Sequence, residues 1–176
     1  MPQIKYLRYR IMKELDFNPS KSTEDFRKNY KLHDHAEFNG KNLLIQWGIN
    51  FKEFGSDKRY QKVWEKGEDK PDLIIEYKNK KALLDWKGKR SAKWLVNERA
   101  VSSYLEWSQK FHVPVLIVFF VFNDHGEIKD RRIAFVGKHS YILSKEKQWD
   151  KNKTIEFQND LPFFDKANFI NNLFLP

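Results

Sequence analysis

The stretch KPDLIIEYKNKKALLDWKGKR, from Lys70 to Arg90, has two short apolar runs on either side of a charged tract. Its two apolar runs, Leu73–Tyr77 and Ala82–Lys87, predict two strands, and the connection between them is short enough for a hairpin. Asp72 stands at the head of the first run, and Asp85 stands near the end of the second. Because side chains alternate along a strand, the hairpin is expected to bring these two acids together on one side of a sheet.

This pair of acids has a chemical consequence. Two carboxylates held close together repel each other and are costly to bury. A hard divalent cation such as Mg²⁺ removes the repulsion, keeps several waters and accepts phosphate oxygens. Such an ion lowers the pKa of a bound water and stabilises charge on a leaving oxygen. Lys87 lies two residues after Asp85, where an ammonium group can orient water or neutralise a phosphate. The pattern therefore predicts a metal site that hydrolyses phosphodiesters.

Helices and strands are predicted on both sides of the hairpin. Apolar spacing predicts a helix before it, although Asn39-Gly40 also favours a turn, and a short alternating strand follows that helix. After the hairpin come a second helix, an apolar run typical of a central strand covered on both faces, and its hairpin partner. The predicted elements are His33–Trp47, Ile49–Phe54, Ser91–Phe111, Val115–Phe122 and Arg132–Val136. This order predicts an α/β fold with a mixed sheet between helices.

The two ends of the chain are expected to add smaller elements. Ile4–Phe17 has helical spacing, and Asn18–Asn29 reads as a loop. Ile155–Phe157 is interpreted as an edge strand, and Asp165–Phe174 as a closing helix with Asp165 as its N-cap. We expect one domain over residues 1–176, with an N-terminal helical arm (1–30), a core (about 33–137) and a C-terminal extension (138–176).

Composition limits the classes of partner and compartment. The chain has 176 residues and a formal net charge of +9, which favours a polyanionic partner such as nucleic acid. It has no cysteine, which excludes disulfides and thiolate zinc sites. The run Val113–Phe122 is about half the length of a membrane helix. The charged N-terminus does not resemble a signal peptide, so an intracellular, cytoplasmic protein without a membrane partner is expected.

The hairpin resembles the PD-(D/E)xK nuclease superfamily. The matching residues are Pro71-Asp72 and Asp85-Trp86-Lys87, and the order of elements from about residue 36 to residue 136 is also similar. The resemblance is to the resolvase-like and restriction-endonuclease-like branches. It implies a restriction-endonuclease-like three-layer core, in which helices flank a mixed central sheet.

The resemblance also implies site residues. Asp72, Asp85 and the backbone carbonyl of Trp86 are expected to bind Mg²⁺ or Mn²⁺, with Lys87 catalytic. In that superfamily a helix supplies a further Glu, and Glu37 is the choice here, with Glu24 and Glu53 as alternatives.

The function implied is a Mg²⁺-dependent endodeoxyribonuclease, of restriction, repair or junction-resolving type. The resemblance also implies DNA as the substrate and a homodimer as the assembly. The alternative is a basic nucleic-acid-binding module without catalysis, in which the acids are ion-pair partners. Four basic residues near the predicted site are expected to contact phosphates: Lys89, Arg90, Lys93 and Arg99. His33 and His35 are interpreted as the solvent-facing start of a helix rather than as zinc ligands.

Overall fold

The structure is a computed structural model that describes residues 23–55, 69–144, 153–158 and 160–174. The predicted helix Ile4–Phe17 lies outside these ranges, as does most of the connection between residues 55 and 70. None of the helices within these ranges is long and apolar enough to cross a bilayer.

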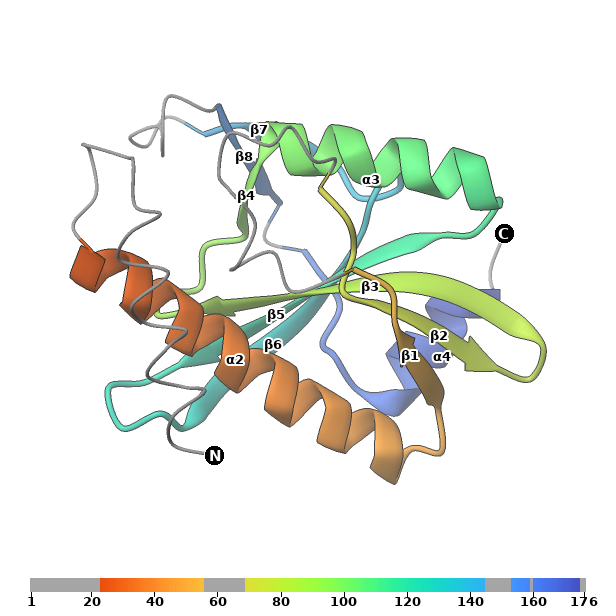
Figure 1. Cartoon of the computed structure of the whole chain (residues 1–176), viewed down its shortest axis with the longest axis horizontal. Coiled ribbons are helices and arrows are strands. Elements are labelled where there is room, and N and C mark those ends of the chain that lie inside the picture. The colour runs from red at the N-terminus through yellow and green to blue at the C-terminus, as the bar shows by residue number, and fades with distance from the viewer. Residues whose placement is uncertain (1–22, 56–68, 145–152, 159, 175–176) are drawn as a thin grey trace.

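A five-stranded sheet forms the middle of the molecule (Figure 1). Its strands run in the order β1-β2-β3-β5-β6, and only the central pair, β3 and β5, is parallel. The sheet is therefore mixed, as the sequence predicts. The strands are β1 (Asn50–Glu53), β2 (Leu73–Tyr77), β3 (Lys80–Lys89), β5 (Val115–Phe122) and β6 (Ile128–Phe135).

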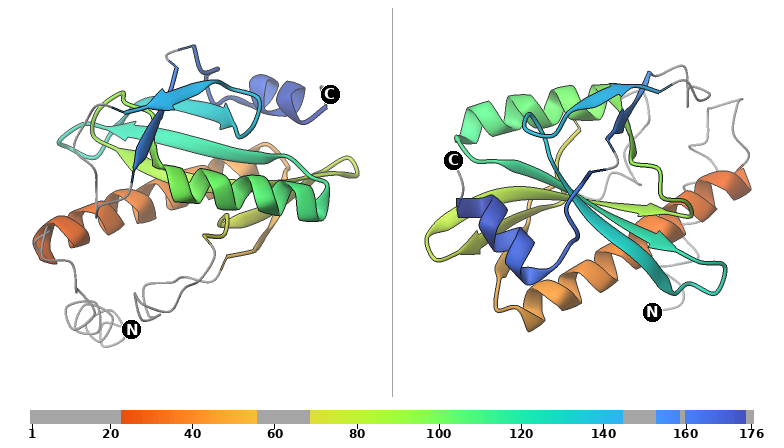
Figure 2. Two further views of the ribbon diagram at one scale, coloured as in Figure 1. Left: turned by 90° about the horizontal axis from the view of Figure 1, so that it is seen from above. Right: turned by 180° about the vertical axis from the view of Figure 1, so that it is seen from behind.

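Helices cover both faces of this sheet, which gives three layers (Figure 2). Helix α2 (Thr23–Gln46) and helix α4 (Lys166–Phe174) contribute to the hydrophobic cluster on one face, and helix α3 (Glu98–Phe111) to that on the other. This is the three-layer arrangement, with a mixed central sheet between helices, that the sequence predicts. Beside α3 lies a small three-stranded sheet in the order β4-β8-β7. Its strands are β4 (Leu95–Asn97), β8 (Thr154–Phe157) and β7 (Tyr141–Leu143).

Strand β5 shows why the core has two halves. All eight of its residues are buried, and alternate side chains point to opposite faces of the sheet. Leu116, Val118, Phe120 and Phe122 join the cluster under α2 and α4, whereas the intervening residues join the cluster under α3. Residues after position 138 pack into both clusters, for example Phe164 into the first and Phe157 into the second.

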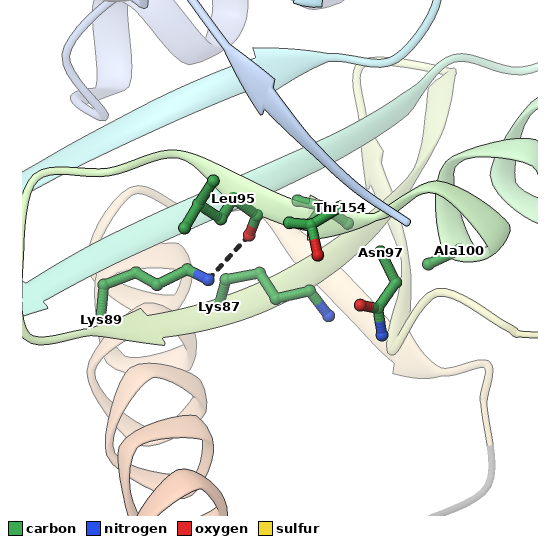
Figure 3. A pocket seen from close by; sticks show the side chains of 7 residues that line it. Lys87, Lys89, Leu95, Asn97, Ala100 and Thr154 are labelled. Carbon is green, nitrogen blue, oxygen red and sulfur yellow. Dashed lines mark hydrogen bonds between the residues drawn. The ribbon is translucent and has the colours of Figure 1, made fainter. Parts of the chain in front are cut away.

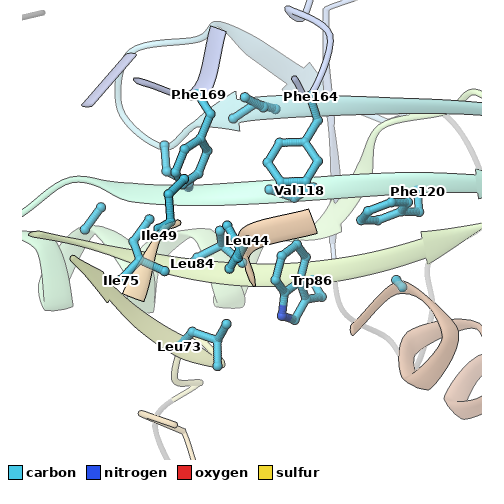
Figure 4. Close-up of a cluster of buried hydrophobic side chains, with 14 of the residues drawn as sticks. Leu44, Ile49, Leu73, Ile75, Leu84, Trp86, Val118, Phe120, Phe164 and Phe169 are labelled. Atoms are coloured by element: carbon cyan, nitrogen blue, oxygen red, sulfur yellow. The ribbon is translucent and has the colours of Figure 1, made fainter. Parts of the chain in front are cut away.

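Two glycines let α2 lie very close to β3. A Cβ added at Gly40 would lie 2.3 Å from the Trp86 ring, so the missing side chain makes room for the indole. A Cβ added at Gly88 would lie 2.2 Å from the carbonyl oxygen of Leu32. Trp86 is fully buried beside Phe120 and Phe164, with ring centroids about 6 Å away (Figure 4). Gly40 is therefore a packing residue within a helix, not part of a turn.

Three local predictions are confirmed. The β2–β3 hairpin turns at Lys78 and Asn79, both with positive φ, as a tight two-residue turn requires. Strand β1 lies within the predicted range 49–54. Asp165 caps α4, because its Oδ1 accepts a hydrogen bond from the backbone N–H of Asn168 at 2.7 Å.

Three other predictions are wrong. Helix α2 begins at Thr23, so residues 23–29 are helical rather than a loop; no glycine or proline interrupts this charged stretch, which has no apolar stripe to reveal it. Residues 91–97 are not helical, because β4 pairs with β8, and Asn97 is extended with ψ 132°. Strand β8 is central in its small sheet rather than at an edge, since it also pairs with the unpredicted β7.

Candidate functional site

The two acids of the hairpin lie opposite each other. Leu73 pairs with Leu84, so the next position outward sets Asp72 against Asp85 on the face covered by α3. Asp85 is buried, with 3% of its surface exposed, whereas the Asp72 side chain keeps 24%. Asp72 Oδ2 accepts a hydrogen bond from the backbone N–H of Trp86 at 2.9 Å. The hairpin thus holds both carboxyl groups at one end of β2.

Lys87 balances part of the negative charge. Its Nζ lies 2.6 Å from Asp85 Oδ2. Burial by itself lowers the pKa of Lys87, but the charges of Asp85 and Asp72 more than offset this, so that pKa lies above its usual value. Burial raises the pKa of Asp72 well above its usual range, and the charge of Asp85 raises it further. The ammonium group of Lys87 therefore does not fully neutralise the carboxyl groups of Asp72 and Asp85.

Tyr104 of α3 covers Asp85 on the side of the sheet that faces α3. The residue is 2% exposed, and burial followed by the charge of Asp85 raises the pKa of its phenol well above the usual value. Its hydroxyl thus stays protonated and able to donate a hydrogen bond to Asp85. Tyr104 is thus a core residue whose polar end faces the acids.

Glu37 reaches the same place from α2. Its Oε1 accepts a hydrogen bond from Lys41 Nζ at 2.7 Å, and Lys41 also contacts Glu53 of β1 at 2.5 Å. The negative charge of Glu37 acts on Asp72. Of the described helical acids, Glu37 is thus the one whose charge reaches the hairpin acids.

His33 also belongs to this site, and the sequence interpretation missed it. Its Nδ1 lies 3.2 Å from the carbonyl oxygen of Trp86, so this nitrogen must carry the proton that it donates. Its Nε2 lies 3.9 Å from both Asp72 Oδ1 and Glu37 Oε2. The available signal was the spacing of His33 and Glu37, which puts both on one side of a helix.

The donor groups suit a hard divalent cation. Within the ranges that the structure covers, no three histidine or acidic side chains are already gathered tightly enough to hold a metal ion. Two facing carboxyl groups, one of them buried, still form a site where a cation would relieve repulsion. The Trp86 carbonyl, Glu37 and the imidazole of His33 border the same space, and all are ligand types that Mg²⁺ or Mn²⁺ accepts.

The four basic residues expected to contact phosphates have different surroundings. Lys89 is half-buried near Lys87 and donates a hydrogen bond to the carbonyl of Leu95 at 2.7 Å. Arg90 is half-exposed and lies 3.6 Å from Asp124. Arg99 is paired with Asp69 at 2.9 Å, and Lys93 is exposed. Of these four, only Lys89 lines the same cavity as Lys87.

Comparison with known proteins supports the fold. No family model matches the chain, and no curated protein matches its sequence significantly. Among solved structures, the chain is similar to Hjc of Archaeoglobus fulgidus, a Holliday junction resolvase from an archaeal hyperthermophile. The TM-score is 0.52 with 10% sequence identity, over 82% of this chain and 98% of that chain. The similarity concerns the fold.

Proposed function

We propose that this chain is a metal-dependent endonuclease of the PD-(D/E)xK type that hydrolyses phosphodiester bonds in DNA. The observation that carries the proposal is the close approach of Asp72 and Asp85 at the end of the β2–β3 hairpin, beside Lys87. Burying the charged groups of Asp85 and Lys87 at the end of an apolar strand lowers the stability of the fold. A bound cation with a phosphate ligand would offset that loss.

We propose that Asp72, Asp85 and the Trp86 carbonyl hold the ion, with Glu37 and His33 completing the set. The ion would be Mg²⁺ or Mn²⁺, and when bound it would polarise the phosphate and lower the pKa of a water. His33 is near enough for this role, because its Nε2 lies 3.9 Å from both Asp72 and Glu37. Its Nδ1 is hydrogen-bonded to the Trp86 carbonyl on the other side of the ring, so the imidazole must turn away from that carbonyl to bind the ion that the carbonyl holds.

Lys87 would act on the phosphate or on the attacking water. Its raised pKa keeps it protonated near neutral pH, so it serves as a fixed positive charge rather than as a base. Once a cation balances Asp85, the ammonium group is released from its ion pair and can neutralise charge that develops on the phosphate. Tyr104 would keep Asp85 oriented through its protonated hydroxyl.

The proposed substrate is duplex or branched DNA. A net charge of +9 favours a polyanion, and the similar protein from Archaeoglobus fulgidus acts on Holliday junctions. A junction-resolving activity is therefore the first form of the proposal to test.

The test is cleavage of a substrate panel by the full chain. The panel holds a plasmid, linear duplex, single strand, four-way junction and RNA, each incubated with Mg²⁺, Mn²⁺ or EDTA. Wild type is compared with Lys87→Ala and with Lys80→Ala, a matched change at the exposed opposite end of the same strand. Metal-dependent cutting that is lost only in Lys87→Ala supports the proposal. Binding without cutting under every metal would instead favour a non-catalytic module.

A further inference from the structure

A small pocket lies next to Lys87, between β3, the small sheet and the start of α3 (Figure 3). Its volume is about 150 Å³, which is the size of a cavity that holds a benzene ring. A nucleoside is too large for this space, whereas a single phosphate group fits. The described lining residues are Lys87, Lys89, Leu95, Val96, Asn97, Ala100 and Thr154.

Two buried oxygen atoms in this pocket need hydrogen-bond partners. Thr154 is 7% exposed, and its Oγ1 makes no hydrogen bond within the described part of the chain. The same holds for Oδ1 of Asn97, the cross-strand neighbour of Thr154. Asn97 is the N-cap residue of α3, yet its side chain makes no capping hydrogen bond. Buried polar groups are costly to leave unpaired, so a polar ligand is the natural occupant.

The charges around the pocket select an anion. Lys87 and Lys89 lie on one face of β3 and converge on the pocket, and none of its described lining residues is acidic. The N-terminus of α3 borders the pocket and adds partial positive charge. Burial, followed by the charge of Lys87, lowers the pKa of Lys89 to about 7. A bound anion would relieve this repulsion.

The position of the pocket relates it to the proposed cleavage site. Asp85, Lys87 and Lys89 form a row on one face of β3, with steps of about 7 Å. The row leads from the acids at one end to the pocket at the other. A DNA strand that has one phosphate at Asp72 and Asp85 can therefore place its neighbouring phosphate in the pocket.

We propose that this pocket is a phosphate subsite. In it, Lys89, Thr154 and Asn97 hold the phosphate group that neighbours the cleaved phosphate on the same DNA strand. The Thr154 hydroxyl and the Lys89 ammonium donate hydrogen bonds to it, and Asn97 does so through its amide nitrogen after a rotation of the side chain. The nature of this ligand rests on the proposed function. The phosphate has two possible sources, an internal phosphodiester or a terminal 5′-phosphate.

The first experiment measures binding without cleavage. The full chain in EDTA is titrated with inorganic phosphate and with a short 5′-phosphorylated oligonucleotide, and the amide NMR signals of residues 97–100 are followed. Lys89→Met and Thr154→Val are each expected to weaken binding about tenfold, because each removes a charge-assisted hydrogen bond. Thr154→Ser keeps the hydroxyl and Lys80→Met removes a charge elsewhere on β3, so both should bind as wild type. Equal affinity in all five proteins would overturn the proposal.

The second experiment identifies the source of the phosphate. Oligonucleotides carry either one neutral methylphosphonate near the cut or a 5′-hydroxyl in place of the 5′-phosphate. The substitution that removes the pocket's ligand should raise KM for wild type about tenfold but leave Lys89→Met unaffected. If neither change in the oligonucleotide affects wild type and Lys89→Met differently, the proposed phosphate subsite is rejected, even when both proteins cleave normally. If phosphate binding follows the variants but nothing is cut, the subsite stands and the nuclease proposal falls.

Discussion

The two faces of strand β3 differ sharply over three successive residues. On the α2 face, Trp86 is buried among aromatic rings and fits against a glycine. On the α3 face, Asp85 and Lys87 form an ion pair beside Asp72, the residue that precedes β2. The first face gains stability from close packing. The second gives up stability to keep charged groups away from water, which is the arrangement that the proposed catalytic function requires.

Strand β3 thus separates packing from charge by the alternation of its side chains. The backbone of Trp86 links the two, because its N–H donates to Asp72 and its carbonyl accepts from His33. Packing of the indole therefore fixes main-chain groups of the site. Substitutions on the α3 face should therefore change cleavage or metal binding, whereas those on the α2 face should change stability.

The largest expected effect is on the α3 face. Asp85→Asn should lower the rate of metal-dependent cleavage at least about a thousandfold, about 4 kcal/mol in the barrier, since a proposed ligand loses its charge. The fold should survive, because Asp72 remains to balance Lys87. Single-turnover kinetics measures the rate, and circular dichroism checks the fold. Glu106→Gln on the outer side of α3 is the control. A normal rate in Asp85→Asn would remove this residue from the site.

The next effect is on the α2 face. Gly88→Ala should destabilise the protein by about 3 kcal/mol, because the new methyl group would overlap the main chain of α2 at Leu32. Chemical denaturation measures the free energy of unfolding. Ser102→Thr, which adds one methyl group at an exposed position of α3, should change it by only about 0.5 kcal/mol. If the two variants unfold alike, the close approach of α2 and β3 is not required.

A smaller effect is expected at His33, which contacts groups of both faces. His33→Ala should weaken Mn²⁺ binding about tenfold, and should weaken Mg²⁺ binding less, since imidazole is a poorer ligand for Mg²⁺. Calorimetric titration of each metal gives the two affinities. His35→Ala is a matched change whose imidazole contacts Gly126 instead, so metal affinity should not change. Equal loss in both variants would point to a general effect on α2.

The smallest predicted effect is a gain in stability. Asp72→Asn should stabilise the metal-free protein by about 1 kcal/mol at pH 7, or about 2–4 °C in Tm. The amide still accepts the hydrogen bond from Trp86, and the burial that raises the pKa of Asp72 no longer acts on a charge. Because ionised Asp72 is unfavourable only above its unfolded pKa, the gain should fade as the pH falls toward about 4. Thermal melts at pH 7 and pH 4 in EDTA check this, with Asp124→Asn at an exposed site as control. A lower Tm at pH 7 would contradict it.

Local patterns predicted the hairpin and the central strand well. Alternation along β3 and the short turn at Lys78-Asn79 are enough to set Asp72 opposite Asp85. Thr154 could not be found this way, and the spacing of His33 and Glu37 did not by itself place His33 beside the hairpin. The contact of His33 with Trp86 spans 53 residues and depends on how deeply α2 seats on β3, which Gly40 and Gly88 determine. Thr154 reaches its pocket only because β8 pairs with β4, a long-range pairing that overrides local preference.

The parallel pairing of β3 with β5 has a consequence for the order of folding. Hairpin β2–β3 is local in the chain, but β3 cannot pair with β5 until residues 90–114 have crossed over the sheet. During synthesis, Asp72 and Asp85 therefore meet while both are still in water, where their repulsion is weak. Their burial becomes costly only when α3 packs over their face of the sheet. Pulse-labelled hydrogen exchange should accordingly protect the amides of residues 73–84 before those of β5, and the reverse order would contradict this sequence of events.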